Sequence, residues 1–336
     1  MRTMTLAILV SVSGALAAQE TDKKKVMCTL PVLKSIAEEL AGSEFEVTSL
    51  SKPDQDPHNV SPTPTLMIKV REAELFIELG LQLELWAEAV VRGSNNAKLA
   101  KGQPGRVVAS AGIPRVEVPE IVSRSEGDVH PEGNPHLWMD PIRAKTIADN
   151  IAAGLKTIAP DKAAAIDDRL KKFKDRIDES LFGKDLLKEV GARTLTRKAL
   201  DGSLNAYLEE KKLSDKLGGW LKKAAPLRGQ KVIEFHKTWT YFAKLFGFEV
   251  VGSVQPKPGI SPGPKDLEAL LAKMKAMGVK LIIVDNFYPS AEPKALAEQT
   301  GAKVAIVPDQ PGGEAGTEDY FKFIDTVLDR MLEGGK

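Results

Sequence analysis

The chain has 336 residues, with 47 lysine and arginine side chains against 46 aspartate and glutamate side chains. A formal net charge of +1 gives no overall field that would attract nucleic acid or an anionic membrane, so we expect neither partner. The only cysteine, Cys28, excludes an intramolecular disulfide, and its apolar neighbours predict a buried, unreactive thiol. The length exceeds what one hydrophobic core usually spans, which predicts two domains.

The N-terminal residues have the pattern of a secretory signal peptide. Arg2 precedes an apolar run at 6–12, and small residues follow at 15–17. The run is far shorter than the ~20 residues of a membrane-spanning helix, so a membrane anchor is disfavoured. We predict a signal peptide at 1–18 and a periplasmic protein. Lipid attachment is not expected, because Cys28 does not directly follow the apolar run.

The segment 24–140 alternates between strand and helix signals. A helical pattern ends at Gly42, and extended runs occur at 25–30, 45–50 and 106–110. This alternation predicts an N-terminal lobe of the α/β class.

The pattern changes at Pro141. Apolar residues at helical spacing over 141–182 predict one long helix, bent at Pro160. Residues 183–228 are rich in Lys, Glu, Asp and Gly, which predicts a charged helical insertion whose charges form a solvated face rather than a docking surface.

The last segment, 229–336, again alternates strands with helices that end in glycine. Strand patterns lie at 231–235, 248–254, 280–285 and 303–309, and helix patterns lie at 238–247, 264–278, 291–301 and 318–334. Such alternation predicts a parallel sheet with both faces covered. The fold class is therefore α/β, with two lobes that are each a parallel-sheet domain.

The four histidines all lie in turns or at strand ends: His58, His130, His136 and His236. In parallel α/β sheets, groups beyond the carboxyl ends of strands gather in one crevice, so loops of both lobes are expected to converge there. Imidazole is the commonest neutral ligand of transition metals. Three imidazoles with one carboxylate suit Zn²⁺.

Three segments in this order resemble the zinc- and manganese-binding solute-binding proteins of ABC importers: DPH at 56–58, NPHLWMDP at 134–141 and FHKTWTYFAKLFGFEV at 235–250. The likeness covers roughly 24–182 and 229–336. It implies two α/β lobes joined by a single long backbone helix, with the metal in the interlobe cleft. The chain lacks the loop rich in histidine and acidic residues that many zinc-binding members carry, and 183–228 has no counterpart in the compact members.

The resemblance also implies a ligand set. His58 and His136 match the two histidines of the first lobe, His236 matches the histidine or glutamate of the second lobe, and Asp309 matches the aspartate after the last strand. A third histidine in place of glutamate favours zinc over manganese, because manganese prefers harder oxygen ligands.

Other residues remain candidates for the site. Asp285 also ends a strand and is the rival of Asp309 as fourth ligand, and His130 is either a loop residue or a reserve ligand. Asp140 follows His136 closely enough to orient its imidazole by a hydrogen bond. Trp138, like the other aromatic residues near these histidines, is expected to pack around the cleft.

We therefore expect a monomeric extracytoplasmic solute-binding protein that delivers zinc, or next manganese, to the permease of an ABC importer, and not an enzyme. The alternatives are a secreted zinc metallohydrolase and a metal-dependent surface adhesin. The sequence contains no HExxH, which disfavours a zinc hydrolase. The adhesin would depend on the insertion at 183–228.

Overall fold

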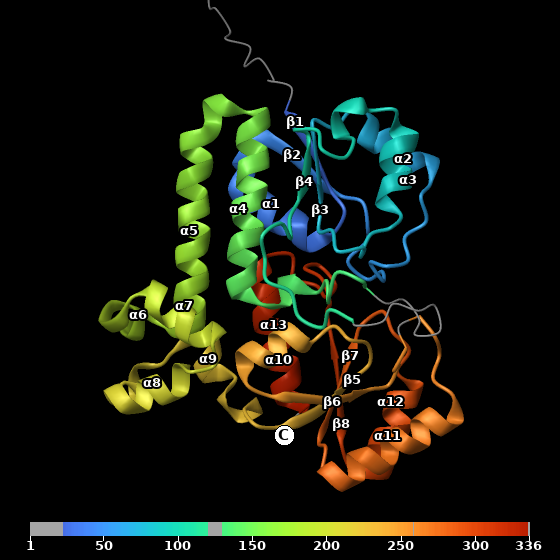
Figure 1. The fold of residues 1–336 in the computed structure, drawn as a ribbon, viewed down its shortest axis with the longest axis vertical. Helices are drawn as coiled ribbons and strands as arrows, with labels where there is room; N and C mark the ends of the chain where they lie inside the picture. The colour runs from blue at the N-terminus through green and yellow to red at the C-terminus, as the bar shows by residue number, and fades with distance from the viewer. Residues whose placement is uncertain (1–22, 120–129, 258, 335–336) are drawn as a thin grey trace, which may run out of the picture.

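The computed structural model describes residues 23–119, 130–257 and 259–334. Figure 1 shows two lobes, one above the other, with a tall pair of helices beside them. The predicted signal peptide lies outside the described residues. Within the ranges described, no helix combines the length and the apolar character that crossing a membrane requires.

The first lobe contains a four-stranded parallel sheet in the order β2-β1-β3-β4. Its elements are β1 (Lys24–Cys28), α1 (Pro31–Ala41), η1 (Gly42–Glu44), β2 (Phe45–Ser49), α2 (Pro64–Arg71), β3 (Leu75–Glu78), α3 (Ala87–Ser94), η2 (Ala97–Leu99) and β4 (Arg106–Val108). Val26 and Cys28 belong to one buried cluster, whereas Met27 and Phe76 belong to another. Successive side chains of a strand point to opposite faces, so both faces of this sheet are covered, as predicted for a parallel sheet.

The second lobe has the same topology, with the order β6-β5-β7-β8 and all neighbours parallel. Its elements are β5 (Lys231–Glu234), α10 (Thr240–Phe246), β6 (Glu249–Ser253), α11 (Pro264–Met277), β7 (Leu281–Asp285), α12 (Ala291–Thr300), β8 (Lys303–Val307) and α13 (Tyr320–Gly334). In each sheet the chain winds in opposite directions from a central strand pair, β1 with β3 and β5 with β7. Ligand sites of α/β sheets form beyond the carboxyl ends of strands at such a point.

The segment 141–182 does not form one bent helix. It forms α4 (Pro141–Ile158) and α5 (Ala163–Phe182), separated by the short helix η5 (Pro160–Lys162), and Ala159 leaves the helical conformation at φ −141° and ψ 70°. Three ion pairs join the two helices: Lys145–Asp178 at 2.7 Å, Lys174–Asp149 at 2.8 Å and Lys156–Asp167 at 2.6 Å. Early residues of α4 pair with late residues of α5, so the helices are antiparallel, as Figure 1 shows. The single long helix that links the lobes is therefore α5 alone.

The segment 183–228 is helical, as predicted. It contains α6 (Lys184–Val190), α7 (Ala192–Leu200), α8 (Leu204–Lys211), η6 (Ser214–Lys216), α9 (Gly219–Lys223) and η7 (Ala225–Leu227), gathered at the lower end of α5 in Figure 1. Its charged residues are mostly exposed, but Leu186, Leu195 and Trp220 are buried in the main core.

One buried cluster runs through both lobes. It includes Val26 of the first sheet, Ile151 of α4, Phe173 of α5 and Ile283 of the second sheet. Because protein interiors are close-packed, this shared core resists movement of one lobe against the other. The loops between the sheets are thereby held at a fixed spacing.

Candidate metal centre

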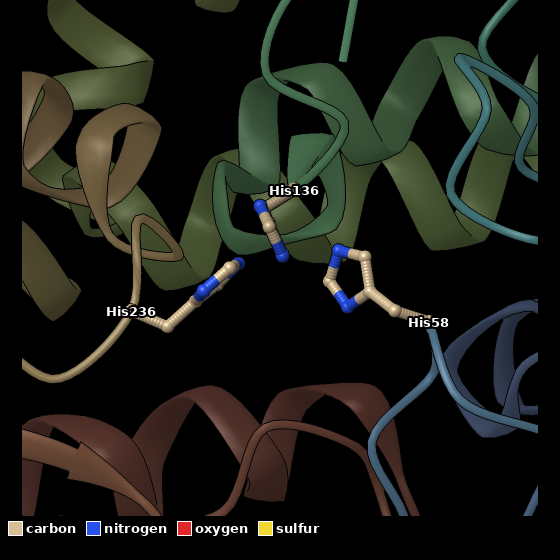
Figure 2. Close-up of side chains that lie close together, drawn as sticks. All are labelled: His58, His136 and His236. Atoms are coloured by element: carbon tan, nitrogen blue, oxygen red, sulfur yellow. The ribbon is translucent and has the colours of Figure 1, made fainter. Parts of the chain in front are cut away.

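Three of the predicted ligands converge between the lobes. His58 follows β2, His136 precedes the short helix η4 (Leu137–Met139), and His236 follows β5. Each offers a ring nitrogen, and these three atoms all lie within 4.8 Å of one another. The ring centroids are 5.2 to 5.5 Å apart, so the rings form a nearly regular triangle. Figure 2 shows the three rings pointing toward one another.

Two of these histidines occupy the same local motif, an Asp or Asn followed by proline and histidine. Asp56 Oδ1 accepts from the backbone nitrogen of His58 at 2.9 Å and lies 2.8 Å from its Nδ1. Asn134 Oδ1 has the same two contacts with His136, both at 2.9 Å. The backbone N–H donates to this side-chain oxygen, which identifies the oxygen as a hydrogen-bond acceptor. The ring Nδ1 that contacts the same oxygen must therefore carry the proton. Both histidines therefore carry a proton on Nδ1, which in a neutral ring leaves Nε2 as the nitrogen with the lone pair.

His236 reaches the same tautomer with a partner from a different element. Its Nδ1 lies 3.3 Å from Gln255 Oε1, which also accepts from the backbone nitrogen of Gly259 at 3.1 Å. The amide oxygen is thus the acceptor, and His236 donates from Nδ1. In this tautomer each of the three imidazoles has its lone pair on Nε2, which is then the nitrogen available to a metal ion.

Electrostatics keep two of these rings neutral. Burial, followed by the neighbouring imidazoles His58 and His236, holds the pKa of His136 well below its usual value. Burial and then His58 lower the pKa of His236 to about 3. Burial alone would raise the pKa of Asp56, but the hydrogen bonds from His58 lower it to about 2. Neutral imidazoles can coordinate a cation without first releasing a proton.

The two candidate carboxylates are buried residues of the second lobe. Asp309 follows β8 and is buried; its Oδ2 accepts from Gln310 Nε2 at 2.9 Å, and burial raises its pKa to about 7. The charges of Asp56 and His58 also act on this pKa, which indicates that Asp309 is near them. Asp285 ends β7, and burial followed by the charge of Asp309 raises its pKa well above the usual value. Neither carboxylate belongs to the group of three histidines within 4.8 Å.

Asp140 does not orient His136, contrary to the sequence-based prediction. Its Oδ1 accepts from the backbone nitrogens of Ile142 at 2.8 Å and Arg143 at 3.4 Å, and its Oδ2 pairs with the Arg143 side chain. It therefore caps the N-terminus of α4. The partner of His136 is Asn134, a role that the repeated Asx-Pro-His motif could have revealed.

His130 lies beside His58. The Nε2 atoms of the two rings are 3.1 Å apart. In the tautomer with the His58 proton on Nδ1, His130 Nε2 is the donor of this contact and His58 Nε2 the acceptor. Trp138 packs against the site as predicted, with its ring centroid 5.2 Å from that of His136.

Several sequence relatives of this chain are metal-binding proteins by name. It is 24% identical over 320 residues to the iron-binding protein YfeA of Yersinia pestis, covering 94% of this chain and 88% of that protein. It is 22% identical over 336 residues to the manganese ABC transporter substrate-binding lipoprotein PsaA of Streptococcus mitis, covering 98% and 94%. The match to the zinc-binding protein AdcA of Streptococcus pyogenes is 23% over 324 residues, 93% of this chain but 55% of that longer protein.

Solved structures show the same fold. The crystal structure of ZnuA superposes with a TM-score of 0.69 at 19% identity, covering 94% of this chain and all of that one. The Mn-bound periplasmic metal-binding protein of Candidatus Liberibacter asiaticus gives a TM-score of 0.66 at 20% identity, with coverages of 93% and 99%. Residues 26–181 and 199–334 match the profile of the family described as zinc-uptake complex component A, periplasmic. The chain therefore belongs to this family of metal-binding, substrate-binding proteins of ABC transporters.

Proposed function

We propose that this chain captures Zn²⁺ outside the cytoplasm and delivers it to the permease of an ABC importer. The observation that carries the proposal is the set of three converging imidazoles, whose ligand nitrogens all lie within 4.8 Å of one another and whose Nδ1 atoms each face an oxygen. We further propose that the chain is exported by the segment 1–18 and acts as a monomer.

Zinc is favoured by the type of donor. Three nitrogen ligands suit zinc, whereas manganese prefers oxygen. The named relatives bind iron, zinc or manganese, so the family alone leaves the metal open. The nitrogen-rich site of this chain supports zinc as the first choice and manganese as the second.

Asp309 is the proposed fourth ligand. It is buried, and its pKa responds to His58, which supports a position on the imidazole side of the second lobe. One carboxylate with three imidazoles would close a tetrahedral site. Such a site has no open position at which to activate water, which agrees with membership in a family of binding proteins rather than enzymes.

The proposal is tested by adding metal to the metal-free protein and following its thermal unfolding. A ligand that binds only the folded state stabilises it by about 4 kcal/mol at a thousandfold excess over its dissociation constant. Zn²⁺ should raise the melting temperature strongly, and Mg²⁺ should not, because imidazole is a poor ligand for a hard cation. Equal stabilisation by the two ions would contradict a nitrogen-rich site.

A further inference from the structure

Building on the zinc site proposed above, we propose that Asn134 is a positioning residue that holds His136 and His236 together as a preformed half of the site before any metal arrives. The proposal concerns the metal-free protein. It assigns to Asn134 a connection between the two lobes in addition to its contact with one histidine.

The side chain of Asn134 has four hydrogen-bond contacts, which is its full capacity. Its Oδ1 accepts from the backbone nitrogen and Nδ1 of His136, both at 2.9 Å. Its Nδ2 donates to the backbone oxygen of Lys237 at 2.8 Å and to Glu117 Oε2 at 2.8 Å. Lys237 directly follows His236, so one amide group connects the segments that carry the two histidines.

Further contacts in the same region cross between the lobes. The hydroxyl of Tyr241, on α10, donates to the backbone oxygen of Asn134 at 2.8 Å and accepts from the backbone nitrogen of Val116 at 3.2 Å. Thr240 Oγ1 donates to Glu117 Oε1 at 3.0 Å. Asn134 is 4% exposed and Tyr241 is fully buried, so water does not replace these bonds easily. The loop of His136 is thus fastened to the second lobe without metal.

His58 is held differently, although its motif looks the same. The partners of the Asp56 side chain are local, namely His58 itself and Asn59, whose Nδ2 donates at 2.9 Å. The preceding turn is held by Trp86, whose Nε1 donates to the backbone oxygen of Pro57 at 2.9 Å within the first lobe. The described hydrogen bonds of Asp56 therefore do not connect the His58 turn to the second lobe.

Opposite exchanges at the two motifs test this difference. Asn134→Asp keeps the acceptor for His136 but turns its second oxygen toward the Lys237 carbonyl and the Glu117 carboxylate, which are both acceptors. We expect this variant to lose about 10- to 100-fold in zinc affinity, the range found for residues that orient metal ligands. Asp56→Asn keeps an acceptor for His58, and its new amide group faces only the exposed side chain of Asn59, which can turn its own amide oxygen toward it. Its loss should therefore lie at the lower end of that range, about tenfold. Competition with a chelator measures both affinities.

Adding Glu117→Gln to Asn134→Asp provides a rescue. The glutamine amide can donate to the new carboxylate, so the double variant should recover part of the lost affinity. A merely structural role for Asn134 would lower the melting temperature without this specific recovery. Equal losses in Asn134→Asp and Asp56→Asn, or no recovery in the double variant, would overturn the proposal.

A measurement on the metal-free wild-type protein does not depend on whether a variant folds. Nitrogen NMR of the imidazoles should show His136 as the Nδ1–H tautomer, and proton contacts should be visible between the rings of His136 and His236. An Nε2–H tautomer of His136, or no contact between these rings, would overturn the half-site even if zinc binds. A wild-type protein that shows both signals but binds no zinc would refute the proposed function and leave the positioning role intact.

Discussion

The indole of Trp138 donates from Nε1 to the backbone oxygen of Asp309 at 3.0 Å. Trp138 comes two residues after His136, so this bond fastens the loop after β8 to the segment that carries a predicted ligand. The buried Tyr320 strengthens the connection, because its hydroxyl donates to the backbone oxygen of Trp138 at 2.8 Å. The position of Asp309 is therefore set by the same segment as that of His136.

This relationship predicts different effects at the two buried aspartates. Asp309→Asn should weaken zinc binding by at least about a hundredfold, or about 2.7 kcal/mol, because an amide is a much poorer ligand than a carboxylate. Asp285→Asn should leave the affinity near that of the wild type. Titration against a competing chelator, with folding followed by circular dichroism, measures both. If Asp285→Asn lost zinc while Asp309→Asn kept it, the fourth ligand would be Asp285.

The four histidines should separate into two classes. Replacing His58, His136 or His236 with alanine leaves zinc without one of three converging nitrogens, and each change should cost at least about a hundredfold in affinity. His130→Ala should cost less than about tenfold, and zinc should associate faster, because His130 occupies the Nε2 of His58 in the metal-free protein. Stopped-flow association and chelator competition test this. A severe loss in His130→Ala would make His130 a ligand.

Glu84 should make the metal-free protein less stable as the pH rises. Burial raises its pKa from 4.5 to about 7, although Thr29 and the backbone nitrogens of Leu79 and Gly80 donate to it. The folded state therefore holds a proton that the unfolded state has lost, so stability is full below pH 4.5, falls above it, and its loss is complete above pH 7.

Glu84→Gln removes this titration. The free energy of unfolding of the variant minus that of the wild type should be larger at pH 8 than at pH 5, by on the order of 2 kcal/mol, since one pKa unit corresponds to about 1.4 kcal/mol. Urea unfolding at the two pH values measures the difference. Parallel pH profiles of the two proteins would show that Glu84 ionises normally.

Replacing Gly219 should destabilise the protein because there is no room for a Cβ atom at this position. It has φ 59°, and a Cβ added there would lie 2.1 Å from the backbone oxygen of Ser180. Gly278 is the matched control, because it has φ 66° and nothing within 4 Å of an added Cβ. Gly278→Ala should cost about 1 kcal/mol from backbone strain alone. Gly219→Ala should lower the melting temperature clearly further, and equal effects would mean that α5 and α9 shift easily.

The sequence by itself determined the alternation of strands and helices and the α/β class of both lobes, because hydrophobic periodicity and glycine at helix ends are local signals. It also drew attention to all four histidines, since residues at strand ends in parallel sheets gather at one edge, and the family resemblance selected His58, His136 and His236 among them. That these residues bind zinc with Asp309 stays a prediction.

The tertiary structure decided what depends on contacts between distant residues. Pro160 is compatible either with a bend in one helix or with a reversal of the chain direction between two helices. The chain reverses, which allows ion pairs between α4 and α5 such as Lys145 with Asp178, and the hydrophobic periodicity of the sequence does not encode this reversal. The tautomer of His236 depends on Gln255, which lies beyond the next strand. The contact of His130 with His58 joins two loops 72 residues apart. Periodicity reports which face of an element is buried, but hydrogen bonds between loops are fixed only when the lobes pack.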